Sequence, residues 1–228
     1  MPYFPAFLDL RDTSCLVVGA GEVGRRKIER ILQCDPAELL IVDPGLDAAE
    51  AQEWAELRAV RIERRPFQPE DIEGRFLVIA STEDPATNEE ISRMCLERSI
   101  LCNIVDQPDL CSFIVPALFS RGELQLAIST GGASPALARK VRQRMGEAFG
   151  PEYASLVWLL RRLRSPVLEL NLGSERNKEI FTALAGDDLL EALQTRDRKK
   201  LEGLLEDKLP PALHPSIGPL LHELDASF

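Results

Sequence analysis

The sequence lacks any hydrophobic run long enough to cross a membrane, since its longest apolar stretches, such as 39–42, are only strand-sized. It also lacks a basic N-terminal segment followed by a long apolar stretch, so we expect no signal peptide and a cytoplasmic protein. A composition of 45% hydrophobic and 28% charged residues is that of an ordinary globular protein. The 228 residues suffice for one large or two modest domains.

Cysteine and histidine are scarce. The five cysteines, at positions 15, 34, 95, 102 and 111, are odd in number and form no CxxC pair, which argues against a disulfide framework and a cysteine-based metal site. We expect them to be small buried residues in a reducing compartment. The two histidines, His214 and His222, lie far along the chain from the motifs described below and are expected on exposed helices. No metal site is predicted.

The net charge of −10 argues against nucleic acid as the main partner. Residues 136–164 nevertheless carry seven basic groups against two acidic ones, a local charge of +5. The basic residues are Arg139, Lys140, Arg142, Arg144, Arg161, Arg162 and Arg164. Either a confined anion-binding site or a solvated helical face would explain this stretch.

Short apolar segments alternate with helical ones along the first part of the chain. Strands are predicted at 14–19, 38–43, 60–64, 75–81 and 101–105, and helices at 22–33, 46–57 and 85–98. This alternation is typical of βαβ units and predicts an α/β protein with a Rossmann-like, doubly wound parallel sheet. Right-handed crossovers then bring the carboxyl ends of the strands, and any ligand, to one edge of the sheet.

The pattern changes after Pro108. Segments 112–120 and 123–129 predict a β-hairpin, which needs a helix, a sheet or a second subunit to cover it. Ser134 and Pro135 are typical of the N-cap and first position of a helix.

From Gly150 onward, leucine stripes predict only helices. Breaks are expected at Pro166, Gly173, Gly186 and Pro210–Pro211. The chain therefore divides into a nucleotide-binding part at 1–111, a hairpin and helix at 112–150, and a helical region at 151–228.

A glycine-rich loop follows the first strand. Gly19-Ala20-Gly21-Glu22-Val23-Gly24 fits the GxGxxG pattern between a strand and a helix. Gly19 would allow the tight turn, Gly21 would let the backbone approach a pyrophosphate, and Gly24 would allow close packing of helix on strand. A glycine turn without a ligand is the alternative.

Asp43 ends the second strand, where an acid commonly accepts hydrogen bonds from the adenosine ribose. An acid there would repel a 2′-phosphate, so NAD is predicted in preference to NADP. A simple turn or cap residue is the alternative.

Asp106 follows the fifth predicted strand, which puts it at the cofactor edge of the sheet. From the residues alone, an Asx-turn residue is the alternative, and Asn103 could serve packing or turn formation. The segment Thr130-Gly131-Gly132 precedes a helix N-terminus and would suit an anion, or could be an ordinary strand-to-helix connection.

The chain resembles the N-terminal part of siroheme synthase and the free-standing precorrin-2 dehydrogenases, some of which are also ferrochelatases. The resemblance is carried by GAGEVGRRK at 19–27, LVIASTED at 77–84 with Asn88, and segments 103–116 and 128–139. It covers residues 3–150, whereas 151–228 match only as a loosely similar helical tail. Gly24 replaces the alanine common in the family. Thr130 stands where some members carry a serine that can be phosphorylated, so a hydroxyl remains at this position.

The resemblance implies NAD-dependent oxidation of precorrin-2 to sirohydrochlorin, in some members followed by iron insertion. It implies a homodimer built through the hairpin and the helix after it. Asp106 matches the family's essential acid–base aspartate, and Glu22, Val23, Asp43 and Pro44 match positions that contact NAD. The sequence leaves no room for a methyltransferase domain, so we expect the substrate to come from another protein.

We therefore hypothesise that a hydride passes from the macrocycle to the nicotinamide while Asp106 accepts a proton. The substrate's carboxylates would be repelled by an acidic protein at long range. Arg139, Lys140 and Arg142 are our candidates to offset this locally, and Thr130 and Ser134 are our candidate hydrogen-bond donors.

The sequence favours a dehydrogenase that does not insert a metal, and it leaves two other functions as alternatives. One is a bifunctional dehydrogenase and ferrochelatase, and the other is a regulatory module that binds NAD without chemistry. Oxidation of a small hydroxy acid is less favoured. It would normally require a His or Lys base near the nicotinamide, and both histidines lie far along the chain from the motifs.

Overall fold

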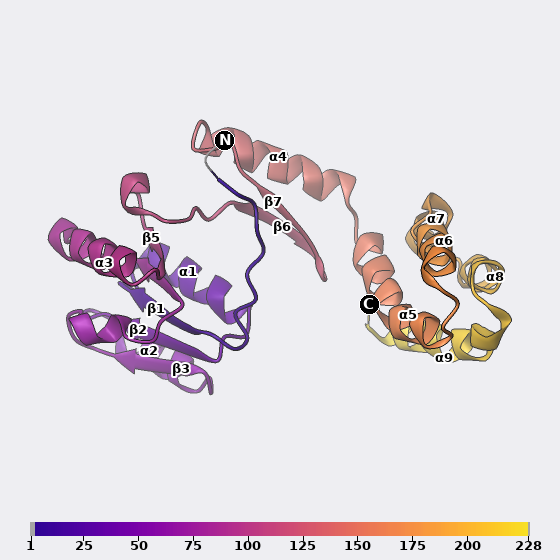
Figure 1. Ribbon diagram of the computed structural model, residues 1–228, viewed down its shortest axis with the longest axis horizontal. Helices are drawn as coiled ribbons and strands as arrows, with labels where there is room; N and C mark the ends of the chain where they lie inside the picture. Colours follow the sequence, from indigo (N-terminus) through magenta and orange to yellow (C-terminus); the bar gives the residue numbers. More distant parts are fainter. Residues whose placement is uncertain (1–2, 228) are drawn as a thin grey trace. The chain divides into compact units, whose positions relative to one another are not determined.

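The computed structural model describes residues 3–227 and divides the chain into two compact units (Figure 1). The first unit ends at Val115 and the second begins at Pro116. Among the described helices, none is both long and apolar enough to cross a membrane.

The first unit is a five-stranded parallel sheet in the order β3-β2-β1-β4-β5, which confirms the predicted fold class. The strands are β1 (Ser14–Val18), β2 (Glu38–Val42), β3 (Val60–Glu63), β4 (Leu77–Ala80) and β5 (Leu101–Ile104). The helices are α1 (Glu22–Leu32), α2 (Ala48–Ala55) and α3 (Pro85–Glu97), with short 3-10 turns η1 (Pro69–Ile72) and η2 (Pro108–Leu110). The strand order reverses between β2 and β4 on either side of β1, which makes the β1–β4 boundary the switch point where ligands bind in such sheets.

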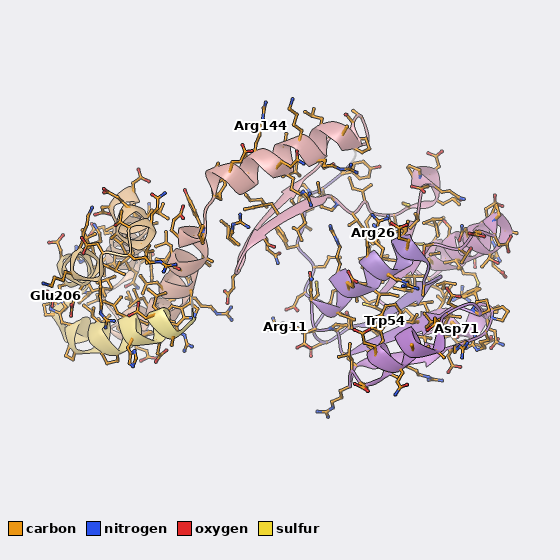
Figure 2. All side chains as sticks on the ribbon, turned by 180° about the vertical axis from the view of Figure 1, so that it is seen from behind. Arg11, Arg26, Trp54, Asp71, Arg144 and Glu206 are labelled. Carbon is orange, nitrogen blue, oxygen red and sulfur yellow. The ribbon has the colours of Figure 1, made fainter. Side chains whose placement is uncertain are left out.

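Both faces of this sheet are buried, as expected for parallel strands covered by helices on both sides. Val17 on β1 and Ile28 on α1 belong to one hydrophobic core, against which Trp54 of α2 packs. Leu16 and the α3 residue Ile91 belong to the other core. Figure 2 shows Trp54 on α2 in this unit. Alternate residues of a strand therefore serve opposite cores, which explains the continuous apolar runs in the sequence.

A buried ion pair secures the connection between β3 and β4. The Asp71 side chain, labelled in Figure 2, is only 6% exposed. Its two carboxylate oxygens accept hydrogen bonds from the Arg65 guanidinium at 2.7 and 2.8 Å, and the Gln68 N–H donates at 2.9 Å. Burial alone would raise the pKa of Asp71, but these hydrogen bonds outweigh it and lower the pKa from its ordinary value.

The second unit begins with the predicted hairpin, formed by β6 (Ala117–Arg121) and β7 (Leu124–Ile128). Its first strand starts later than expected, because Ser112 is bonded instead to Cys102 on the edge of β5. The helix α4 (Pro135–Ala148) covers one face of the hairpin, where Arg121 donates a hydrogen bond to the Phe149 carbonyl at 3.1 Å. A helix therefore provides one of the three expected kinds of cover.

The rest of the second unit is helical, as predicted. It comprises α5 (Glu152–Glu169), α6 (Ser174–Leu184), α7 (Asp187–Gln194), α8 (Arg198–Lys208), η3 (Pro211–Leu213) and α9 (His214–Ser227). Breaks fall at Gly173, Gly186 and Pro210–Pro211, but the break predicted at Pro166 is wrong, since α5 continues through it. Leu163 and Val167 on either side are buried in the helical core, so packing offsets the backbone hydrogen bond that proline removes.

We predict that Asp71→Asn weakens the first unit at neutral pH, because it removes charge-assisted hydrogen bonds worth about 1–3 kcal/mol. The lowered pKa of Asp71 means that its contribution is present above the unfolded value of about 4 and is lost as pH falls through the folded value. The free energies of unfolding of wild type and variant should therefore converge in acid. Guanidinium denaturation followed by Trp54 fluorescence in a Trp158→Phe background measures this, with the exposed Asp12→Asn as control. Parallel pH curves would contradict it.

Candidate functional site

The loop after β1 lies against the loop after β4 at the switch point of the sheet. Gly19 has a φ of +90°, which side chains rarely adopt, and a Cβ there would lie 2.8 Å from the Ser81 carbonyl oxygen. The Ser81 hydroxyl donates to the Gly19 carbonyl at 2.8 Å. A Cβ on Gly24 would lie 2.1 Å from that same carbonyl oxygen. Glycine is therefore required at both positions for these backbones to meet.

Gly21 differs from its two neighbours in the motif. It is exposed, has an ordinary φ of −61°, and a Cβ added to it would meet no described atom within 4 Å. It forms the N-cap of α1, and no side-chain hydrogen bond caps the helix there. The N–H groups and partial positive charge of this helix end are therefore open to a phosphate. Glu22 is exposed and Val23 half-buried in the first turn. The backbone thus offers a cradle that fits a dinucleotide pyrophosphate.

Asp43, half-buried at the end of β2, fixes the same loop. One of its carboxylate oxygens accepts a hydrogen bond from the Ala20 N–H at 2.5 Å, and the other accepts from the Gly45 N–H at 2.6 Å. The neighbouring Pro44 is exposed. The sequence suggested a ribose contact or a cap for Asp43, and did not suggest this tie between the carboxyl ends of β1 and β2. A carboxylate can accept further hydrogen bonds beside these two.

Asp106 lies on the loop after β5, at the same edge of the sheet as the glycine loop. It is exposed and has a φ of +60°, a conformation that Asp and Asn tolerate better than most residues. No described residue donates a hydrogen bond to its carboxylate. Asn103, only 8% exposed on β5, donates to the Phe113 carbonyl at 3.1 Å, a contact between the strand and the segment that follows the Asp106 loop.

Lys27 is half-buried in α1 and interacts electrostatically with this loop. Burial chiefly lowers the pKa of Lys27, with Arg30 and Arg26 adding to the effect, while Cys111 and Asp106 act in the opposite direction. Lys27 therefore lies within electrostatic range of Asp106. Sequence reasoning assigned it no role, although it closes the first motif.

The loop after β4 is held from inside by Asn88, which is 3% exposed. Its amide donates to the Thr82 carbonyl at 3.1 Å and accepts from the Thr82 hydroxyl at 2.8 Å. Asp84 caps α3 by accepting from the Ala86 N–H at 3.2 Å. Sequence reasoning assigned Ser81 no role, although a hydroxyl at the end of a predicted strand was a usable signal.

The predicted anion-binding residues belong to the second unit. The Thr130 hydroxyl donates to the Ser134 carbonyl, and the Ser134 N–H donates back to it, both at 3.1 Å. The Ser134 hydroxyl accepts from the Leu137 N–H at 3.2 Å and so forms the predicted N-cap. This arrangement commits the hydroxyl proton of Thr130, whereas that of Ser134 has no acceptor among the described residues.

Positive charge gathers along α4 behind this cap. Arg139 and Lys140 are exposed, Arg142 is half-buried, and Arg144 projects outward from the helix in Figure 2. Leu137, which shares an i+4 apolar pattern with Val141 and Met145, is 51% exposed and lies outside the packed stripe.

The cysteines and histidines follow the expectations only in part. Cys15, Cys95 and Cys102 are buried as expected, but Cys34 is exposed and Cys111 is intermediate. His222 is exposed on α9, whereas His214 is half-buried and its Nε2 lies 3.1 Å from the Leu209 carbonyl oxygen.

Comparison with known proteins identifies two family matches. Residues 6–117 match a family described as NAD(P)-binding, and residues 121–148 match one described as "Sirohaem biosynthesis protein central". The first match makes this unit an NAD(P)-binding domain.

The chain is also similar to curated siroheme synthases. The protein of Thioalkalivibrio sulfidiphilus is 42% identical over 73% of this chain and 34% of its own length. Those of Methylobacillus flagellatus and Nitrosococcus oceani are 34% and 32% identical over 91% and 96% of this chain, and 45% and 46% of their own lengths. The chain thus spans less than half of these relatives. The solved structure of "SirC, precorrin-2 dehydrogenase" is 29% identical with a TM-score of 0.75, covering 90% of this chain and all of that one.

We predict that Gly21→Ala separates folding from cofactor binding. The new methyl group meets no described atom and φ is ordinary, so the free energy of unfolding should fall only by about 0.5–1 kcal/mol, because alanine is a poorer N-cap residue than glycine. Because the methyl group intrudes on the open helix end, NAD should bind about tenfold more weakly, a change of ~1.4 kcal/mol. Titration calorimetry measures the affinity of both variants for NAD. The control is Gly203→Ala on α8, where an added Cβ likewise meets no described atom within 4 Å. Equal affinity for NAD in both would refute the cradle.

Proposed function

Because this chain belongs to the family of the siroheme synthase N-terminal region, with its NAD(P)-binding and central parts, we propose that it is an NAD-dependent precorrin-2 dehydrogenase. The reaction would convert precorrin-2 to sirohydrochlorin. The observation that carries this proposal is the presence of an open dinucleotide cradle at Gly21 and an exposed carboxylate, Asp106, on one edge of the same sheet.

Gly19, Gly21 and Gly24 would hold the pyrophosphate with the N-terminus of α1, while Glu22, Val23 and Pro44 border the site. When bound, the nicotinamide supplies a hydride acceptor. Asp43 would accept hydrogen bonds from the ribose hydroxyls with its remaining lone pairs. Its negative charge at this point favours NAD over NADP, whose 2′-phosphate it would repel.

Asp106 would act as the base that takes the proton leaving the macrocycle. Its exposure leaves the carboxylate accessible to a substrate, and no described residue competes for its lone pairs. The proton would then pass to water. General-base catalysis of this kind contributes about 10²–10⁴-fold to a rate.

We further propose that α4 binds the carboxylates of the substrate. Arg139, Lys140 and Arg142 supply positive charge on a protein of net charge −10, and arginine suits bidentate carboxylate contacts. The available hydroxyl proton of Ser134 makes it a better donor than Thr130, whose proton is already engaged. An unchanged KM for precorrin-2 in Arg139→Gln and Arg142→Gln variants would exclude this role.

The region 112–150 is proposed to mediate a homodimer. The outer face of the hairpin, with exposed Ser120, Gln125 and Ala127, is not the face that α4 covers. Leu137 on α4 is also exposed, at 51%. A sedimentation mass equal to one chain would exclude this assembly.

We predict that Asp106→Asn lowers kcat by about 10²-fold or more while leaving the affinity for NAD unchanged. Asparagine keeps the shape of the side chain and tolerates the positive φ, whereas alanine would add backbone strain to the loss of the carboxylate. Absorbance of sirohydrochlorin and NADH on mixing with precorrin-2 and NAD measures turnover.

The matched control is Asp109→Asn, an exposed aspartate on η2 of the same loop, which should retain full activity. If Asp106→Asn turns over at the wild-type rate, Asp106 is not the base. If the wild-type protein forms neither sirohydrochlorin nor NADH, the chain is a regulatory module instead. Adding ferrous or cobaltous ion as a second substrate tests for metal insertion. A dehydrogenase alone, which we propose, would leave sirohydrochlorin without metal, whereas a bifunctional chelatase would insert the ion.

A further inference from the structure

The strand β5 is at the edge of the sheet, so its outer backbone groups have no neighbouring strand. Two residues that follow the Asp106 loop, Cys111 and Ser112, take hydrogen-bonding positions of the missing strand. The Ser112 hydroxyl accepts from the Cys102 N–H at 2.8 Å, and the Ser112 N–H donates to the Cys102 carbonyl at 2.9 Å. At Ile104, two residues further along β5, the Cys111 sulfur forms the corresponding hydrogen bonds.

The Cys111 sulfur forms contacts with both ends of the Asp106 loop. At the strand end, Sγ accepts a hydrogen bond from the Ile104 N–H at 3.1 Å and lies 3.6 Å from the Asn103 amide nitrogen. The thiol has one proton to donate, and the Ile104 and Gln107 carbonyl oxygens both lie 3.2 Å away. A side chain at position 111 therefore ties residues 103–104 to residue 107, across the position of Asp106.

No hydrogen bond from a described residue fixes the Asp106 carboxylate, although Lys27 attracts it electrostatically. It is exposed and receives no hydrogen bond from a described residue, so its position is set by the backbone of its loop. That backbone has a positive φ at a residue other than glycine, a conformation that persists only where the surroundings enforce it. The contacts of Cys111 lie on both sides of this position, and they reinforce the backbone hydrogen bond that the Gln107 N–H donates to the Ile104 carbonyl at 3.3 Å.

We propose that Cys111 is a positioning residue for the dehydrogenase reaction, whose thiol holds the Asp106 loop in the conformation that presents its carboxylate. This inference rests on the proposed function. It gives the half-buried Cys111 a purpose other than packing, and it needs no reaction at sulfur. Misplacing a reactive group by about 1 Å can cost ~10²-fold in rate, so loosening the loop should affect kcat.

The test compares Cys111→Ala, Cys111→Ser and Cys95→Ala in the complete protein. Cys111→Ala should lower kcat about 10- to 100-fold with an unchanged KM for NAD, because none of its contacts involves residues 19–24. Cys111→Ser should recover most of kcat, since a hydroxyl can both donate and accept. Cys95 is fully buried in the hydrophobic core against which Cys111 packs, so Cys95→Ala should lower the melting temperature but leave kcat unchanged.

A double-mutant cycle shows whether Cys111 acts through Asp106. In an Asp106→Asn background, Cys111→Ala should cause little further loss of kcat, because the group that it positions is already gone. Equal activity of Cys111→Ala and wild type would overturn the proposal, as would additive losses or a serine variant as impaired as the alanine variant. If wild type itself fails to make sirohydrochlorin and NADH, the proposed function fails instead.

Discussion

The contact between the backbone turns after β1 and β4 is the constraint on which the site depends. Gly19 approaches Ser81 so closely that a Cβ at position 19 or 24 would collide with the carbonyl oxygen of one or the other turn. Asp43 joins the turn after β1 to the end of β2 through two backbone N–H groups. The carboxyl ends of three adjacent strands are therefore locked together before any ligand binds, and this leaves the N-terminus of α1 open.

The second group of functional candidates rests on a different kind of support. Asp106 is held by the backbone of its loop, and this loop is fastened by side chains of modest size, those of Asn103, Cys111 and Ser112. The proposed active site thus combines a rigid cofactor cradle, built from close backbone contacts, with a carboxylate whose placement depends on a few hydrogen bonds. The proposed reaction would require both parts to be held close to their productive geometry, so these few hydrogen bonds would matter as much as the cradle.

Much of the fold could be predicted from the sequence, because apolar periodicity and turn residues agreed along the first unit. The strands and helices lie where the pattern put them, and Ser134 caps α4 as expected. The helix break predicted at Pro166 was wrong, because packing of its neighbours in the helical core outweighs the local preference of proline. The late start of β6 was hidden as well, because residue 112 is bonded to a strand ten residues earlier, and no local pattern reveals that contact. The motifs identified the candidate residues, but not the double tie of Asp43 or the contacts of Cys111, which depend on tertiary geometry.

The two edges of the parallel sheet are closed by different means. On β3, Arg61 forms an ion pair with Glu63, which places charge along that border. On β5, Cys111 and Ser112 occupy the hydrogen-bonding positions that a strand from another chain would need. The segment that follows Asp106 therefore also blocks pairing of β5 with a strand from another chain. A substitution that removes the sulfur at position 111 would leave the Ile104 N–H and carbonyl without these partners, so under our proposal it would affect both strand pairing and the reaction.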